Sequence, residues 1–251
     1  VGVKMNLATC IKEEETNFEE WLNEERKEKT DRKYSQRYER LLLEQKRFSK
    51  PTVLRQRENI ELILSNCGDP KNEKAWDRKG MVVGSVQSGK TSNYIGLINE
   101  AVDHGYKIII VIAGNNENLR SQTQQRINEG FIGEEKNMTN LRYSKIGVGL
   151  YSDKSINRVV TLTFKEYDFN IEQARQGALK IEKNLKQPVV FVIKKNKDIL
   201  KNLLDWLKSS PALIGEEKIK LPLLLIDDEA DNASINTAGS QKKRNENRAL
   251  I

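Results

Sequence analysis

The chain has 251 residues, of which 37% are hydrophobic and 31% are charged. This length suits one large domain or a domain with an appendage, and no apolar run approaches the roughly 18 residues that span a bilayer, so we expect no membrane segment. The formal charge of +7 weakly favours an anionic partner such as nucleic acid. Two cysteines, Cys10 and Cys67, form no C-x-x-C pair, which favours a cytoplasmic location over a disulfide-rich secreted class.

Residues 1–75 are expected to form a helical N-terminal arm. Their aromatic and leucine side chains recur at i, i+3 and i+4, which predicts two amphipathic helices, and Pro51 precedes a third. The apolar positions are Phe18, Trp21, Leu22, Tyr34, Tyr38, Leu41 and Leu42. The arm is interpreted as packed surface helices or, alternatively, as a docking arm for a partner or nucleic acid.

A phosphate-binding loop follows the arm. The sequence GSVQSGKT matches G-x-x-x-x-G-K-[ST] at every fixed position, after a short apolar run and before a predicted helix. The glycines let backbone N–H groups face a phosphate, lysine reaches the β and γ phosphates, and threonine offers its hydroxyl to Mg²⁺. The predicted nucleotide-binding residues are Gly84, Ser85, Val86, Gln87, Ser88, Gly89, Lys90 and Thr91.

Residues 76–251 alternate short apolar runs with helical stretches, the pattern of an α/β fold with a mainly parallel sheet flanked by helices. Unbroken apolar runs are typical of strands buried on both faces. We predict strands near 81–84, 107–113, 145–150, 159–163, 189–193 and 222–227. Helices are predicted near 90–102, 116–129, 171–185 and 196–209.

An acidic group follows the last predicted strand, in the run LLLIDDEAD. Because ligands of parallel sheets bind at the carboxyl ends of the strands, Asp227, Asp228 and Glu229 are expected beside the phosphate loop. Asp228 and Thr91 are predicted ligands of Mg²⁺, which prefers oxygen donors. Glu229 is the candidate for orienting or deprotonating the attacking water, and Lys90, Asp228 and Glu229 are the predicted catalytic residues.

The acidic run and the phosphate loop together resemble known motifs. Asp228 to Asp231 spell the DEAD box of superfamily-two helicases, and VIAGNNENLRSQTQQR resembles their Ia region. More closely, KGMVVGSVQSGKTSNYIGLI, this Ia-like run and LLLIDDEADNASINT resemble the bacterial Z-one endonuclease-domain family over about residues 76–251. The resemblance implies the first RecA-like lobe of a helicase-like P-loop ATPase that uses ATP and Mg²⁺ in restriction or phage defence.

The resemblance also implies roles and partners. Lys90 would bind the phosphates, Thr91 and Asp228 the metal and Glu229 the water, and Asp231 would link the site to a later motif. The family continues into a T-A-T motif and a second RecA-like lobe with arginine fingers, and neither precedes Ile251. We therefore expect a fragment that partners a second lobe, DNA and a nuclease or other defence subunit, with slow ATP turnover on its own.

No nuclease centre is expected in this chain. His104, the only histidine, is expected in an exposed turn, and the fragments at Glu73-Lys74 and 216–218 lack the strand that a carboxylate and lysine nuclease requires. Gln56 and Arg78 are weak candidates for adenine contacts. Polar residues after two strands are candidates for phosphate contacts with nucleic acid: Asn118, Arg120, Ser121, Gln122, Lys194, Lys195 and Asn196.

Three functions remain open from the sequence. The leading hypothesis is an ATP-binding lobe of a DNA-dependent helicase or translocase. The alternative is a nucleotide-sensing interaction module, in which ATP controls docking of a partner without translocation. A DNA-binding structural fragment that no longer hydrolyses ATP is the third.

Overall fold

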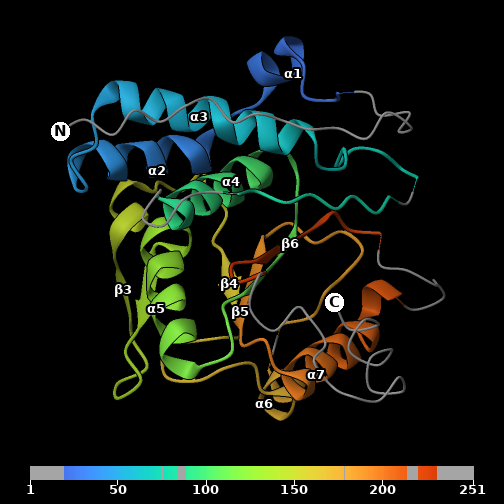
Figure 1. Cartoon of the computed structure of the whole chain (residues 1–251). Coiled ribbons are helices and arrows are strands. Elements are labelled where there is room, and N and C mark those ends of the chain that lie inside the picture. Colours follow the sequence, from blue (N-terminus) through green and yellow to red (C-terminus); the bar gives the residue numbers. More distant parts are fainter. Residues whose placement is uncertain (1–19, 75, 84–88, 178, 214–219, 231–251) are drawn as a thin grey trace. The chain divides into compact units, whose positions relative to one another are not determined.

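The structure is a computed structural model that describes residues 20–74, 76–83, 89–177, 179–213 and 220–230 (Figure 1). The chain divides into two compact units, residues 1–106 with 129–156 and residues 107–128 with 157–251. Each unit is described separately. The predicted division into an arm (1–75) and a lobe (76–251) stays a prediction.

Unit 1 is built mainly from helices. Helices α2 and α3 pack on α4 and on each other (Figure 1), and the predicted apolar positions Tyr34, Tyr38, Leu41 and Leu42 are buried on α2. A two-stranded antiparallel sheet, β2 with β3, completes the unit. Its elements are α1 (Glu24–Lys29), α2 (Lys33–Glu44), α3 (Lys50–Ser65), α4 (Lys90–His104), β2 (Glu134–Lys136), β3 (Tyr143–Lys145) and the 3-10 helix η2 (Gly147–Tyr151), with the π-helix η1 (Asn128–Ile132) entering it.

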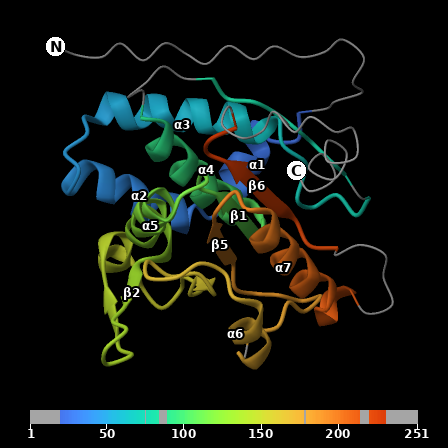
Figure 2. The same ribbon diagram turned by 60° about the horizontal axis from the view of Figure 1, so that its bottom comes forward.

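Unit 2 contains a four-stranded parallel sheet in the order β4-β5-β1-β6. Every residue of β1 and β5 is buried, which confirms the interpretation of their unbroken apolar runs. Trp206 of α7 packs edge to face on Phe191 of β5, and α7 lies along the sheet in Figure 2. The elements are β1 (Ile108–Ile112), α5 (Glu117–Ile127), β4 (Val160–Thr161), α6 (Ile171–Gln176), β5 (Val189–Ile193), α7 (Lys197–Lys208), η3 (Pro211–Leu213) and β6 (Leu223–Asp227).

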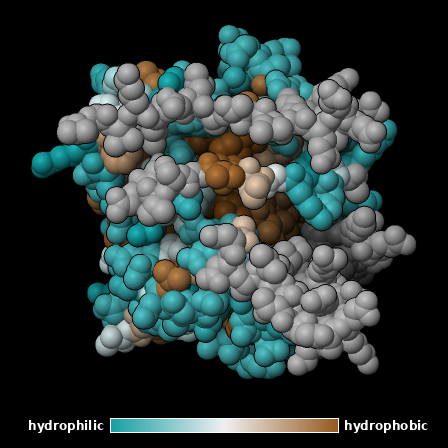
Figure 3. All heavy atoms as spheres, viewed as in Figure 1, coloured by the Kyte–Doolittle hydropathy of each residue, from teal (hydrophilic) through white to brown (hydrophobic). Residues whose placement is uncertain are grey.

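Two predicted strands are wrong. Residues 81–83 form no strand, and Met81 and Val83 are 81% and 82% exposed. In the view of Figure 3, apolar residues are visible near the centre of the surface. A short run with exposed side chains gains little of the apolar burial that stabilises a central strand. Residues 147–151 form η2 instead of a strand, because Gly147 adopts φ +48°, which extended backbone does not allow.

Two further predictions differ from the structure. The helix expected over 171–185 ends at Gln176, because Gly177 closes it and its N–H bonds to the carbonyl of Gln173 at 3.0 Å. His104 is not exposed: it is the last residue of α4, is 5% exposed, and packs edge to face on Trp21. Its Nδ1 lies 3.3 Å from the hydroxyl of Thr30.

Two acidic residues on α4 bind the start of helix α2. The carboxylate of Asp103 accepts the backbone N–H groups of Tyr34 and Ser35 at 2.9 and 2.8 Å. These are first-turn amides of α2, whose own N-cap residue makes no side-chain cap, so Asp103 supplies the cap from another helix. One turn earlier on α4, Glu100 binds Arg32 through contacts of 2.7 and 3.0 Å.

Ionisation of Glu100 makes the stability of unit 1 depend on pH. Burial opposes its ionisation, but the facing His104 and Arg32 side chains outweigh burial and lower the pKa of Glu100 from 4.5 to about 2. In this range the unfolded chain binds more protons than the folded chain, so the stabilisation is complete above pH 4.5 and is lost as pH falls from 4.5 to 2.

We therefore expect Glu100→Gln to lower the urea midpoint at pH 7 and to flatten its fall between pH 4.5 and 2. Glu25→Gln is the control, because Glu25 forms an exposed pair with Lys29 that is worth little. The measurement is the urea midpoint at half-unit pH steps. Parallel acid profiles for wild type and Glu100→Gln would contradict the assignment.

Candidate nucleotide site

The residues predicted to bind phosphate lie in unit 1. Gly84 to Ser88 lie outside the described residues, and the described part begins at Gly89 with φ 78° and ψ 24°. This left-handed conformation favours glycine, as the tight turn of a phosphate loop requires. Lys90 follows as the first residue of α4 and is exposed, and Thr91 is half-buried.

The start of α4 has the properties of an anion-binding helix end. Gly89 has no side chain to cap the helix, and no side-chain cap is formed there; α3 and α5, for comparison, are capped by Ser49 and Asn116. The first N–H groups of a helix and its dipole attract anions. Joined to the adjacent lysine and threonine, this end can hold a phosphate group.

The predicted acidic residues lie in unit 2, at the carboxyl end of β6. Asp227 is the last residue of the strand, and the N–H of Asp228 bonds to the carbonyl of Ile112 on β1 at 3.0 Å. Glu229 reaches the loop after β1, where a Cβ on Gly114 would lie 3.4 Å from the Glu229 carboxyl group. Gly114 also has φ +73°. Asp227, Asp228 and Glu229 therefore lie at the carboxyl end of the last strand, as predicted. Their predicted position beside the phosphate loop stays a prediction.

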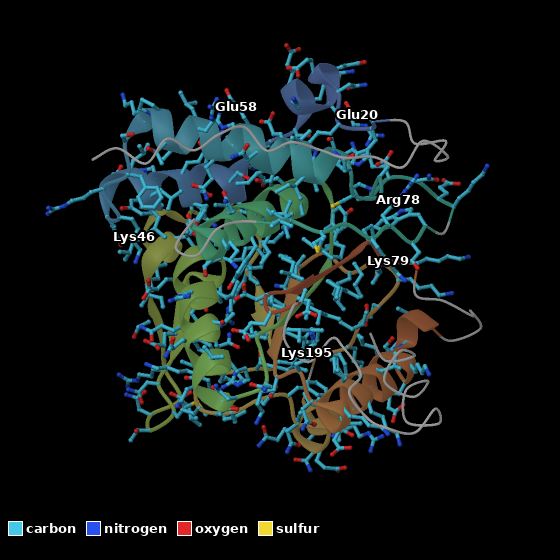
Figure 4. All side chains as sticks on the ribbon, in the orientation of Figure 1. Glu20, Lys46, Glu58, Arg78, Lys79 and Lys195 are labelled. Atoms are coloured by element: carbon cyan, nitrogen blue, oxygen red, sulfur yellow. The ribbon has the colours of Figure 1, made fainter. Side chains whose placement is uncertain are left out.

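A buried lysine fixes this acidic group. The Nζ of Lys195 lies 2.7 Å from Oδ2 of Asp227 and 3.3 Å from the backbone carbonyl of Glu229. Its own N–H bonds to the carbonyl of Gly114 at 2.6 Å. The Lys195 side chain is 5% exposed and lies inside the unit (Figure 4). Lys195 thus crosses the end of β1 and ties β5 to β6.

Two of the residues proposed for nucleic-acid contact are turned inward in this structure. Arg120 is 0% exposed; it binds the carboxylate of Glu117 at 2.6 Å and donates to the carbonyl of Lys165 at 2.9 Å. The Lys195 side chain forms an ion pair with Asp227. The sequence suggested that Arg120 and Lys195 are surface cations, because both residues follow the ends of strands. In the structure each side chain is buried against partners in its own unit.

The other residues proposed for nucleic-acid contact differ in their surroundings. Lys194 pairs with Glu117 at 3.0 Å in a partly exposed bridge, and Asn196 is used as the N-cap of α7. Asn118 and Gln122 are exposed on α5, and Ser121 is half-buried. Nucleic-acid binding at these positions stays a prediction.

Sequence reasoning missed the pair of Lys195 and Asp227. A signal existed, since both residues directly follow buried apolar runs, and parallel strands bring such positions to one edge of a sheet. The strand order was needed to show that the lysine reaches across a third strand. Asp231, assigned a linking role, lies outside the described residues.

Within the described ranges, no group of three or more histidine, cysteine, aspartate or glutamate side chains is placed to hold a metal ion. No helix in the part of the chain that the structure describes has the length and apolar character needed to cross a bilayer. Comparison of the chain with protein-family models, curated proteins and solved structures found no match.

Proposed function

We propose that this chain is the ATP-binding, RecA-like lobe of a DNA-dependent, helicase-like or translocase-like ATPase of the cytoplasm. The observation that carries the proposal is the left-handed Gly89 followed by Lys90 and Thr91 at the start of α4. A glycine in this conformation, then a lysine and a hydroxyl at a helix N-terminus, is the arrangement that binds nucleotide phosphates.

The acidic end of β6 supports hydrolysis rather than binding alone. Mg²⁺ takes oxygen ligands and keeps several waters, so Asp228 and Thr91 are suitable protein ligands for an ion that ATP phosphates also hold. Glu229, held against Gly114, would accept a proton from the water that attacks the γ-phosphate. The joint action of these residues on one nucleotide is part of the proposal.

The resemblance to the Z-one family supplies the proposed setting. DNA, a second RecA-like lobe and a nuclease or other defence subunit are the proposed partners. An arginine finger is typically worth 10³ to 10⁵ in rate, so a partner lobe that supplies one would convert slow turnover into rapid turnover.

A second function, a nucleotide-sensing interaction module, is favoured by one observation. Side chains of α2 and α3 reach the first turn of α4, so ligand binding there has a direct connection to the helical arm. ATP would then control docking of a partner without movement along DNA.

The first test is nucleotide binding by the full chain. Mg·ATP is expected to bind wild type, and Lys90→Ala is expected to weaken binding about 10- to 100-fold, because a hydrogen bond to a charged group is lost. Lys79→Ala is the matched control, since Lys79 is an exposed lysine of the preceding segment (Figure 4). Equal binding by wild type and Lys90→Ala in calorimetry would refute the proposal.

The second measurement separates the two functions. ATP turnover by the chain joined to its partner lobe is compared with and without DNA. Stimulation by DNA favours the helicase-like or translocase-like ATPase. Partner binding that depends on ATP but not on DNA favours the sensing module.

A further inference from the structure

Two side chains of the helical arm meet at one residue of the phosphate-loop helix. The hydroxyl of Tyr38 on α2 lies 3.0 Å from the backbone carbonyl of Ser92 and 3.1 Å from its hydroxyl. The amide Nε2 of Gln56 on α3 donates to the same Ser92 hydroxyl at 3.0 Å. Ser92 is the third residue of α4 and follows Thr91.

Both contacting side chains are buried and held by packing. Tyr38 is 5% exposed and Gln56 is 3% exposed. A Cβ on Gly96 would meet Ile60 and lie 3.4 Å from the Tyr38 ring, and a Cβ on Gly130 would lie 3.2 Å from the other side of that ring. Two glycines therefore make room for the tyrosine, which leaves its hydroxyl directed at Ser92.

The tyrosine can act only as a neutral hydrogen-bonding group at physiological pH. Burial raises the pKa of Tyr38 to about 12, and the hydrogen bonds of Ser92 and Gln56 only partly oppose this shift. The Gln56 amide is neutral as well. The contact with Ser92 is therefore built from uncharged groups inside the unit, where their positions are fixed.

The opposite end of α4 is attached to the same arm helix. Asp103 caps α2 through Tyr34 and Ser35, and Tyr38, one turn further along α2, reaches Ser92. Helix α2 is thus tied to both the last turn and the first turn of α4. A change in the first turn of α4 cannot occur without a change in the contacts of the arm.

We propose that Tyr38 and Gln56 are positioning residues that hold the first turn of α4 through Ser92 and couple the packing of α2 and α3 to phosphate binding at Lys90 and Thr91. This inference rests on the proposed nucleotide site. A helix end frays easily because its first amides lack partners within the helix. Fixing it beforehand lowers the ordering cost that a ligand must meet.

The coupling acts in both directions. If the arm contacts strengthen nucleotide binding, the nucleotide must strengthen the arm contacts by the same factor. A purely structural role for Tyr38 and Gln56 would lower stability without this reciprocal effect.

The affinity test measures binding of Mg·ADP by calorimetry to the full chain. Tyr38→Phe, Gln56→Leu and Ser92→Ala each remove a contact, and each is expected to weaken binding about three- to tenfold. Adding Gln56→Leu to Ser92→Ala is expected to cause little further loss, because both changes remove the bond from the Gln56 amide to the Ser92 hydroxyl. Ser49→Ala is the control: it removes the N-cap of α3 away from Ser92, and is expected to bind as wild type does.

Hydrogen exchange gives the second readout, which does not depend on affinity. Saturating Mg·ADP is expected to slow amide exchange in α2 and α3 of wild type and of Ser49→Ala, and to slow it less in Ser92→Ala, which keeps only the bond from Tyr38 to the backbone carbonyl of residue 92. Suppose that wild type binds Mg·ADP, that Lys90→Ala binds it more weakly, and that the Ser92, Tyr38 and Gln56 variants behave as wild type in both measurements. This inference is then overturned while the nucleotide site stands. Failure of wild type to bind overturns both.

Discussion

Replacing Lys195 by methionine is expected to lower the free energy of unfolding by about 3 to 5 kcal/mol, the usual cost of removing one partner of a buried ion pair. The Lys195 side chain is 5% exposed and its partner Asp227 is 15% exposed. Methionine preserves most of the side-chain volume but leaves the Asp227 carboxylate without its cation. The loss is measured by urea denaturation at pH 7.

Its immediate neighbour provides a matched control. Lys194 pairs with Glu117 at a similar distance, 3.0 Å, but the two side chains are 28% and 45% exposed, so Lys194→Met is expected to cost under about 1 kcal/mol. Adding Asp227→Leu to Lys195→Met is expected to recover much of the loss, because no buried charge then remains. Equal losses for the two lysine variants would show that the Asp227 contact contributes little.

The helices and central strands were predictable because hydrophobic periodicity reflects burial directly. β1 and β5 are unbroken apolar runs that are buried along their whole length, and α4 follows the predicted helix of 90–102 closely. Errors arose where a local glycine decided the backbone. Gly147 turned a strand-like stretch into η2, and Gly177 ended α6 early.

The candidate site was predictable as residue types but not as contacts. The phosphate-loop motif specified Gly89, Lys90 and Thr91, and the acidic run specified Asp228 and Glu229. The sequence did not indicate that Lys195 would be buried against Asp227. A lysine that follows a strand gives the same sequence pattern whether its side chain faces solvent or a carboxylate. Partners distant in the chain become identifiable only once strand order and helix packing are known.

The same reasoning explains why Ser92 was overlooked. Its partners lie 54 and 36 residues earlier in the chain, and Gln56 was named only as a weak candidate for an adenine contact. In the structure, Gln56 is 3% exposed and its amide donates to the Ser92 hydroxyl. Side chains of α2 and α3 therefore contact the first turn of α4.

Glu229→Gln is expected to lower kcat for ATP hydrolysis about 10²- to 10⁴-fold, the range that a positioned general base contributes. The side chain lies against Gly114, and glutamine has nearly the same shape, so this packing is retained. Because Glu229 is assigned to the water rather than to the phosphates, affinity for Mg·ATP is expected to stay within a few-fold of wild type. Single-turnover kinetics of the chain, with the proposed partner lobe and DNA present, measure both quantities.

Two variants make the assignment specific. Asp228→Asn, which alters a proposed metal ligand, is expected to weaken the response to Mg²⁺ as well as the rate, whereas Glu182→Gln, an exposed change in the same unit, is expected to have no effect. If Glu229→Gln hydrolyses ATP normally while Asp228→Asn is inactive, the general base must be a residue other than Glu229. A glutamine variant that binds Mg·ATP but no longer turns it over would separate the two steps, because the proposed function assigns binding to Lys90 and Thr91 and hydrolysis also to the Glu229 carboxylate.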